Sequence, residues 1–236
     1  MLISVIVIAR NEERELAELL PQLTRGHDVE VIVVDGESGD GTQAVVERCP
    51  CRYLSAPAGR ARQLNAGARM AQGDVLLFLH ADCRLQQGWK TELEEELNNP
   101  AVVGGAFSLR MSGGYPWVDR FLSWSGTVNA RRSNVFLGDH SIFVRKHIFE
   151  KAGGFPDIDL MEDYFFSKKL SSLGQLVQLR SASLASARRF MANGYIKTIL
   201  QMRLLRLLTA LGWSSRRLQS WYLNCSRTSR EGRRPY

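Results

Sequence analysis

Three apolar runs dominate the first third of the sequence, and each ends abruptly in polar residues. Leu2 to Ile8, Val29 to Val34 and Val75 to Leu79 consist almost entirely of aliphatic and aromatic side chains. Strands that are apolar along their whole length are buried on both faces, which is typical of a parallel sheet covered by helices. The sequence therefore predicts an α/β fold with a mainly parallel central sheet flanked by helices.

Segments with helical spacing alternate with these strands. In the first half the pattern predicts helices over residues 12–23, 42–48 (with Thr42 as the capping residue), 60–71 and 89–97, and a short strand over 52–55. The second half is less regular. There we expect strands over 102–111, 141–144 and 175–179, the last at an edge, and helices over 117–131, 162–173 and 196–211.

The positive charge is concentrated at the end of the chain. The whole sequence of 236 residues has a net charge of +7, yet the part from Arg188 onward holds eleven of the 31 basic residues and a single acid, Glu231. A chain of this length can form one sizeable core with a short appendage. We therefore expect a main domain over residues 1–190 and a basic helical extension with a tail over 191–236.

The start of the chain and its cysteines indicate a cytoplasmic protein with reduced thiols. A signal peptide would need a basic start, a longer apolar stretch and a small-residue cleavage site, and no stretch is apolar enough to span a membrane. The basic helix over 196–211 has two interpretations. It either packs on the body, or lies peripherally on an anionic membrane at its inner face, with its leucines inward. Nucleic-acid binding is not expected, because aromatic residues do not alternate with the basic ones.

Charged and glycine-rich residues gather after the predicted strands, over residues 9–12, 35–40, 55–62 and 80–82. In open parallel sheets, ligands bind beyond the carboxyl ends of the strands. Neither glycine pattern in these segments matches a dinucleotide fingerprint or a P-loop, which argues against NAD and against ATP bound in the Walker manner. The sequence thus predicts a ligand site of another kind at this edge.

The segment His80-Ala81-Asp82 directly follows a buried strand. The carboxylate of Asp82 is either a turn or capping residue, or a ligand for a divalent cation that neutralises a diphosphate. His80 is a second metal ligand, a phosphate donor or a satisfied core imidazole. Mg²⁺ prefers oxygen ligands, whereas Mn²⁺ tolerates imidazole better.

Two further clusters suit a nucleotide. Asp35 closes the second strand in a glycine-rich turn, and it either caps the turn or accepts a hydrogen bond from a base or a ribose hydroxyl. Arg60, Arg62 and Asn65 stand at the start of a predicted helix. Helix starts favour anions, and arginine adds paired donors for phosphate, although either arginine could equally be a solvated surface residue.

Acids and bases of the second half are candidates for the chemistry. Glu162 and Asp163 either cap a helix or take a proton from an attacking hydroxyl, because a partly dry cleft can tune a carboxylate towards neutral pH. Asp139 and His140 form a second polar cluster. Arg188 either faces a diphosphate or merely begins the basic end of the chain.

Together these motifs resemble the family 2 glycosyltransferases, whose fold is of the GT-A type. The resemblance covers residues 2–190, in order. It is carried by Ser4-Val5-Ile6-Val7-Ile8-Ala9-Arg10-Asn11-Glu12-Glu13, Val31-Ile32-Val33-Val34-Asp35-Gly36, Gly73 to Asp82, Gly153-Gly154-Phe155 and Met161-Glu162-Asp163. The segments Gly59 to Ala68 and Ser186-Ala187-Arg188-Arg189-Phe190, with the His-Ala-Asp segment, are similar to the branch of arsenosugar biosynthesis-type or radical-SAM/selenodomain-associated transferases.

The resemblance implies inverting transfer of a sugar from a nucleoside-diphosphate sugar, commonly UDP-linked, to an acceptor hydroxyl. Asp163, or else Glu162, would be the base, Asp82 with His80 would hold Mn²⁺ or Mg²⁺, and the acceptor side would include Gly105, Asp139 and His140. The residues expected to bind the nucleotide sugar are Ala9, Arg10, Asn11, Glu12, Asp35, Glu37, Arg60, Arg62, Asn65, His80, Ala81, Asp82 and Arg188. The family usually has two aspartates where this chain has His80 and Asp82, so metal binding could be weaker, differently selective or replaced by arginines.

Two rival functions fit the same sequence. A sugar-nucleotide pyrophosphorylase shares the nucleotide-binding half of this fold, but it would need a glycine-rich loop with a basic residue after the first strand, and Ala9-Arg10-Asn11-Glu12 differs from that. A non-catalytic nucleotide-sugar-binding module would bind the same donor without turnover. The donor sugar, the acceptor and the oligomeric state do not follow from the sequence.

Overall fold

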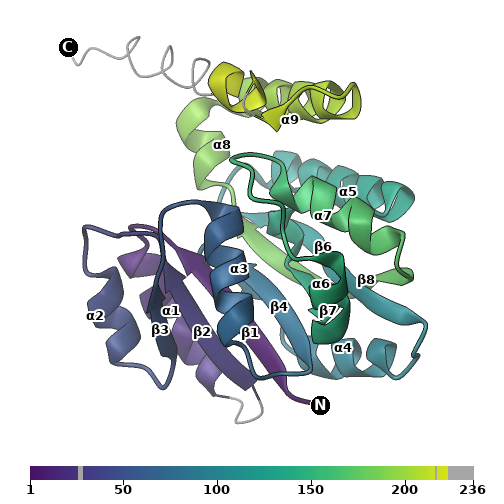
Figure 1. Cartoon of the computed structure of the whole chain (residues 1–236). Coiled ribbons are helices and arrows are strands. Elements are labelled where there is room, and N and C mark those ends of the chain that lie inside the picture. The colour runs from purple at the N-terminus through teal and green to yellow at the C-terminus, as the bar shows by residue number, and fades with distance from the viewer. Residues whose placement is uncertain (26–28, 216, 223–236) are drawn as a thin grey trace, which may run out of the picture.

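A single sheet runs through the protein, and helices cover both of its faces (Figure 1). The structure is a computed structural model that describes residues 1–25, 29–215 and 217–222. Within these residues the eight strands follow the order β3-β2-β1-β4-β7-β6-β8-β5. The strands are β1 (Ile3–Ala9), β2 (Val29–Asp35), β3 (Arg52–Ser55), β4 (Val75–His80), β5 (Cys83–Leu85), β6 (Val102–Ser112), β7 (Ile142–Arg145) and β8 (Gln175–Ser186).

The helices connect these strands and form the two outer layers. They are α1 (Glu13–Thr24), α2 (Thr42–Glu47), α3 (Arg60–Met70), α4 (Trp89–Leu97), α5 (Pro116–Ser133), the 3₁₀ turn η1 (Gly138–His140), α6 (Lys146–Ala152), α7 (Glu162–Ser171), α8 (Arg188–Asn193) and α9 (Tyr195–Ala210). In the described residues no helix combines the length and apolar character needed to cross a membrane.

The predicted α/β fold is confirmed, and its first half is wholly parallel. Strands β1 to β4 pair parallel in the order β3-β2-β1-β4. In the second half β7 runs antiparallel to both β4 and β6, whereas β6 and β8 are parallel. The sheet as a whole is therefore mixed.

Alternate side chains of the apolar strands supply two separate cores. On one face Val5 and Val7 of β1 pack with α1 and α4 through leucines such as Leu16 and Leu93. On the other face Ile6 packs with residues of α3, α6 and α7. Because both sides of β1 are buried, the strand is apolar except for Ser4, whose hydroxyl donates a hydrogen bond of 2.5 Å to Glu30.

Two details of the predicted secondary structure were wrong, and β5, α6 and α8 were not predicted. Thr42 does not cap α2 but is its first residue; its hydroxyl accepts a hydrogen bond from the backbone N–H of Glu12 at 3.0 Å and donates one to Asp40 at 2.6 Å. The strand expected over residues 175–179 extends to Ser186 and lies between β6 and β5, so only its first part is at an edge. The cause in both cases is pairing with distant residues, which local spacing does not reveal.

Candidate active site

The carboxyl ends of the first strands meet at one edge of the sheet. The register pairs Ala9 with Asp35 and Ile8 with His80. Gln63 of α3 is buried behind them, and its amide group donates hydrogen bonds to the carbonyl oxygens of Ala9 and Val34, each at 2.9 Å. These contacts fix the backbone of two strand ends that the sequence predicts to bind a ligand.

Asp35 is held rigidly at this edge. Its carboxylate is buried and accepts hydrogen bonds from the Tyr53 hydroxyl at 2.9 Å, from the backbone N–H of Ser38 at 3.3 Å and from the Ser38 hydroxyl. Glu37 and Asn11 in the adjoining loops both adopt left-handed backbone conformations, with φ of 61° and 56°. The loops are therefore shaped by specific contacts around Asp35.

Asn11 joins the loop after β1 to the loop after β2. Its backbone N–H donates to the Ser38 hydroxyl and its side-chain oxygen accepts from the backbone N–H of Gly39, each at 2.8 Å. Arg10 beside it is exposed. The polar groups of Asn11 are thus used within the protein, whereas Arg10 is open to solvent at the edge of the site.

Three of the predicted site residues make contacts away from Asp35 and Asp82. The Nε of Arg62 lies 3.2 Å from Asp157, and its side chain lines a surface pocket with Ser55 and Pro57 at the end of β3. The amide of Asn65 exchanges hydrogen bonds of 2.8 and 2.9 Å with the backbone of Phe155, so it fastens α3 to the turn before α7. Gly105 lies inside the sheet, where an added Cβ would be 2.0 Å from the carbonyl oxygen of Val177.

His80 lies against Gly138 of η1. A Cβ at Gly138 would lie 2.6 Å from the Cε1 and Nε2 atoms of the imidazole, so only glycine leaves room for this ring. Burial, followed by the positive charge of Arg60, lowers the pKa of His80. The imidazole is therefore neutral at neutral pH. Its Nδ1 is 4.0 Å from a carboxylate oxygen of Asp139, which is too far for a direct hydrogen bond.

Arg188 links Asp82, which follows β4, to two acids that follow β1. One guanidinium nitrogen lies 3.3 Å from Asp82 and 2.5 Å from Glu12, and the other lies 3.2 Å from Glu15. The hydrogen bond to Glu12, together with the charges of Asp82 and Glu15, raises the pKa of Arg188 against the opposing effect of burial. The structure thus brings together Glu12, Asp82 and Arg188, as expected for one site.

Glu162 and Asp163 begin α7 and are largely buried beside His80. Together with His80 and Gly138, both acids line one small cavity. Burial and the neighbouring charge of Asp163 raise the pKa of Glu162 to about 7. Burial also raises the pKa of Asp163, although its carboxylate accepts hydrogen bonds from the backbone N–H groups of Gly138 at 2.8 Å and Tyr164 at 2.7 Å.

Arg60 occupies the middle of the acidic groups. Its guanidinium is 3.9 Å from Glu162. Burial alone would lower the pKa of Arg60, but the combined negative charges of Glu162, Asp163, Asp139 and Asp82 raise it. The charges of these four carboxylates, which come from three separate segments of the chain, therefore act on one cation, whose side chain is 48% exposed.

Two more arginines interact electrostatically with these groups. The pair Arg188-Arg189 either faces a diphosphate or begins the basic end of the chain by sequence, whereas no local motif assigns Arg206. Burial and repulsion from Arg60 lower the pKa of Arg189, while the charges of Asp139 and Asp82 oppose this change. Arg206 of α9 is also desolvated, and it interacts with the charges of Asp163 and Asp139. Its place in the basic helix over 196–211 was the only sequence signal for Arg206.

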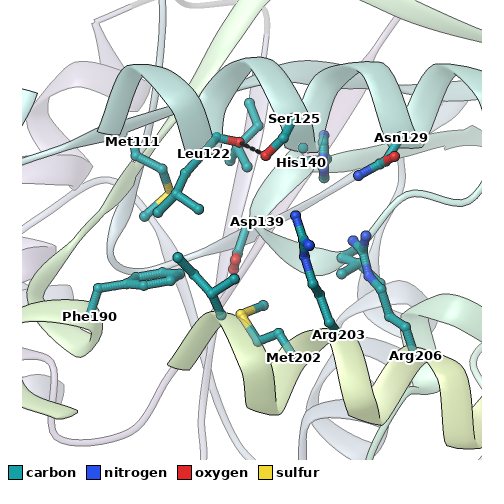
Figure 2. Close-up of a pocket in the computed structure, with 14 residues that line it drawn as sticks. Met111, Leu122, Ser125, Asn129, Asp139, His140, Phe190, Met202, Arg203 and Arg206 are labelled. Carbon is teal, nitrogen blue, oxygen red and sulfur yellow. Dashed lines mark hydrogen bonds between the residues drawn. The ribbon is translucent and has the colours of Figure 1, made fainter. Parts of the chain in front are cut away.

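A pocket between α5 and α9 opens next to these groups (Figure 2). Asp139 points into it, and Arg203 and Arg206 extend from α9 towards it. His140 also lines the pocket; its Nδ1 is 3.2 Å from the carbonyl oxygen of Phe107, and burial lowers its pKa to about 4. The other walls are mostly apolar and consist of Leu109, Met111, Leu122, Leu137, Phe190, Ile199 and Met202.

The described residues contain no group of three or more histidine, cysteine, aspartate or glutamate side chains arranged to hold a metal ion. Asp82 and a neutral His80 are a two-ligand set. Such a set fits a cation that completes its shell with diphosphate oxygens and water, and an imidazole ligand favours Mn²⁺ over Mg²⁺. The residues therefore fit a cation that is shared with a substrate.

Comparisons with known proteins establish the family and the fold. The sequence profile described as "Glycosyl transferase family 2" matches residues 4–154. An uncharacterized glycosyltransferase of Haemophilus influenzae is 30% identical over 72% of this chain and 62% of its own. The chain spans about three fifths of the length of the first curated relatives it matches.

Solved structures show the same fold. The mannosyltransferase PcManGT of Pyrobaculum calidifontis, in complex with GDP-Man and Mn²⁺, has a TM-score of 0.65 and 19% identity, over 96% of this chain and 73% of its own. TarS 1-349 of S. aureus, in complex with UDP-GlcNAc, has a TM-score of 0.61 and 19% identity, over 80% of this chain and 59% of its own. At this level of identity the likeness establishes the fold.

Proposed function

The chain belongs to glycosyl transferase family 2, and we propose that it transfers a sugar, with inversion, from a nucleoside-diphosphate sugar to an acceptor hydroxyl. The observation that carries this proposal is the position of two buried acids, Glu162 and Asp163, beside a cluster of arginines that follows the strand ends. Direct displacement needs a base on one side of the sugar and neutralised charge on its leaving group.

The nucleotide would occupy the edge formed by β1, β2 and β4. Asp35, fixed by Tyr53 and Ser38, is the acceptor for a base or ribose group, and the loop from Ala9 to Glu12 lies next to it. A UDP-linked donor is our first choice. It is supported by the UDP-GlcNAc complex of TarS, whereas PcManGT is described with GDP-Man.

The diphosphate would lie between Asp82 and the arginines. Arg188 and Arg60 are placed to hold phosphate oxygens through paired donors. Asp82 and His80 would share a divalent cation with the diphosphate, and a bound cation would supply additional neutralisation of the leaving group. Ion pairs of Arg188 with Glu12 and Asp82 keep the guanidinium in position before the donor arrives.

Asp163 is the proposed base. Burial raises its pKa, which makes its carboxylate a stronger proton acceptor at neutral pH than an exposed aspartate. It would take the proton of the acceptor hydroxyl while that oxygen forms a bond to the anomeric carbon. The bond from this carbon to the diphosphate breaks, and the leaving diphosphate keeps the electron pair.

The acceptor would enter through the pocket between α5 and α9. Asp139 points into this pocket and also lies beside His80, so the pocket leads to the proposed reaction centre (Figure 2). Its mostly apolar walls favour an acceptor with an apolar part. The similarity to the arsenosugar biosynthesis-type branch is compatible with this proposal and does not define the acceptor.

A donor hydrolysis and transfer screen tests the proposal. The intact chain would be incubated with UDP- and GDP-sugars, with Mn²⁺, Mg²⁺ or a chelator, and release of the nucleoside diphosphate would be measured. We expect release from one donor class, strongly reduced by Asp163→Asn and by Asp82→Ala. The control is Glu95→Gln, which removes an exposed acid of α4 remote from the site.

Two outcomes would overturn the proposal. Activity unaffected by both Asp163→Asn and Asp82→Ala would refute the site assignment. Release of pyrophosphate from UTP and a sugar phosphate would instead support the pyrophosphorylase. If the intact chain binds the donor without turnover, as the variants do, the protein is a binding module.

A further inference from the structure

One surface of the molecule carries most of its exposed apolar side chains. In the described residues, eleven of the fourteen large exposed hydrophobic residues fall in two segments, residues 115–124 and 191–213. We call the exposed side chains of α5 and α9 in these segments the α5–α9 face. Surface clusters of this kind mark contacts with proteins, ligands or membranes.

The two helices run side by side. At their starts the hydroxyl of Tyr195 accepts a hydrogen bond from the backbone N–H of Tyr115 at 3.1 Å, and the two rings are 5.7 Å apart. Towards their ends Arg132 of α5 and Leu207 of α9 line one groove. Figure 1 shows both helices beyond one end of the sheet. Their exposed side chains therefore belong to neighbouring parts of the same surface.

Helix α9 presents an apolar stripe to solvent. Its exposed members recur at intervals of three or four residues and are Ile196, Leu200, Leu204, Leu207 and Leu211, an arc of about 80° on the helix. The opposite side, which is buried, carries Thr198, Leu205 and Thr209. A helix that faced only water would place its leucines inward and its threonines outward, so this helix needs a second apolar environment.

Helix α5 adds aromatic side chains to the face. Trp117 is 77% exposed and Trp124 is 64% exposed, and the ring of Phe121 lies 6.2 Å from that of Trp124. The inner side of α5 is fastened to β6 through hydrogen bonds of Ser123 and Thr127. The aromatic side chains therefore point outward. Tryptophan is enriched where membrane proteins meet the membrane–water interface.

The charge around this apolar surface has one sign. Lys197 and Arg203 flank the stripe of α9, and the exposed basic residues of α5 are Arg120, Arg131 and Arg132. The only acid in either helix is Asp119, which is buried and accepts hydrogen bonds from the backbone N–H of Gly114 at 2.9 Å and from the Tyr195 hydroxyl at 3.3 Å. Two copies of such a face would repel each other, whereas an anionic surface would attract it.

We propose that the α5–α9 face docks on an anionic lipid bilayer. The tryptophans and leucines lie at the depth of the headgroups and the first acyl carbons, and the arginines contact the anionic headgroups. This interaction goes beyond the glycosyl transfer proposed above and does not depend on it. Transfer to a soluble acceptor could fail while the chain still binds lipid.

Vesicle flotation with the full chain tests the docking. Vesicles of phosphatidylcholine alone would be compared with vesicles that also contain phosphatidylglycerol. We expect at least about tenfold more binding to the anionic vesicles, because each basic residue near the surface adds to the attraction. The triple variant Ile196→Gln, Leu200→Gln, Leu204→Gln should lose this binding. The matched control is Phe165→Gln, which removes an exposed aromatic residue of α7 outside the face.

Quenching of tryptophan fluorescence by brominated lipids provides a second, independent measurement. Quenching should be strong in the parent chain and lower in the double variant Trp117→Phe, Trp124→Phe, in which the fold is kept by conservative replacement and the exposed Trp213 remains as a second reporter. Equal binding of the parent to neutral and anionic vesicles would overturn the proposal, as would full binding by the triple variant. Self-association without vesicle binding, abolished by the triple variant, would assign the face to a second copy instead.

Discussion

The two halves of the sheet build the site in different ways. From β1 to β4 the strands are parallel, a helix connects each strand to the next, and the polar residues appear where the strands end. From β6 to β8 the chain reverses direction, and site residues come from the start of α7, from η1 and from the start of α8, just after β8. The first half is thus suited to hold a nucleotide, and the second half supplies the groups for proton transfer.

The largest expected effect separates these two roles. Asp163→Asn should lower kcat by about 10²- to 10⁴-fold, since a positioned general base contributes that much, and should leave the donor KM nearly unchanged. Initial-rate kinetics over a range of donor concentrations measure both parameters. A large rise in donor KM with kcat intact would place Asp163 in donor binding. It would contradict the assignment of nucleotide binding and proton transfer to different halves of the sheet.

The next effect concerns the core under the catalytic half. Phe166 is buried and its ring centroid lies 4.1 Å from that of Phe155, in a cluster of phenylalanines that supports α7. Phe166→Ala should lower the free energy of unfolding by about 3–5 kcal/mol, because it leaves a cavity. Chemical denaturation monitored by circular dichroism gives this value. A loss below about 1 kcal/mol would mean that this core collapses readily around the gap.

The pH dependence of stability reports on Glu162. Its pKa is about 7 in the folded protein against an ordinary value of 4.5. Between these values the folded state binds more protons than the unfolded state, so this group's contribution is present at low pH and is lost as pH rises through 7. Urea denaturation at several pH values should show a decline that is smaller in Glu162→Gln. Identical slopes in both proteins would contradict the burial of this acid.

The smallest expected effect lies in the nucleotide-binding half. Tyr53→Phe removes the hydroxyl that donates to Asp35 and leaves the ring in place. A hydrogen bond of this kind contributes about 0.5–1.5 kcal/mol, so we expect a similar loss of stability and a rise of a few fold in donor KM. Denaturation and donor titration measure the two. An unchanged donor KM would show that Ser38 alone orients Asp35.

Sequence alone predicted the first half well, because its information is local. An apolar run defines a buried strand, and the polar residues that follow it, such as Asp35 and Asp82, reach the same edge wherever the strands are parallel. Glu162 and Asp163 stood out as paired acids, and the family pattern added the preference for Asp163 as the base. The boundary near residue 190 stays a prediction, and residues 223–236 of the predicted extension and tail lie outside the described residues.

The rest depended on distant contacts. Asn65 has the residue type of a ligand-binding amide, yet it bonds Phe155, ninety positions along the chain. Arg206 reaches Asp163 and Asp139 only because α9 returns across α5 and η1. Likewise, the sequence of α5 predicts an ordinary helix and does not reveal that its tryptophans point outward. Periodicity locates an apolar stripe but does not say what covers it.

The ion pair between Glu12 and Arg188 joins residues separated by 176 positions. During synthesis the chain can therefore form β1 to β4 long before Arg188 leaves the ribosome, but the arrangement around Asp82 stays incomplete until then. Closing so long a loop is slow relative to local βα pairing. A ribosome-bound chain stopped before residue 188 should thus hold a folded nucleotide-binding edge without the arginine that completes its diphosphate site.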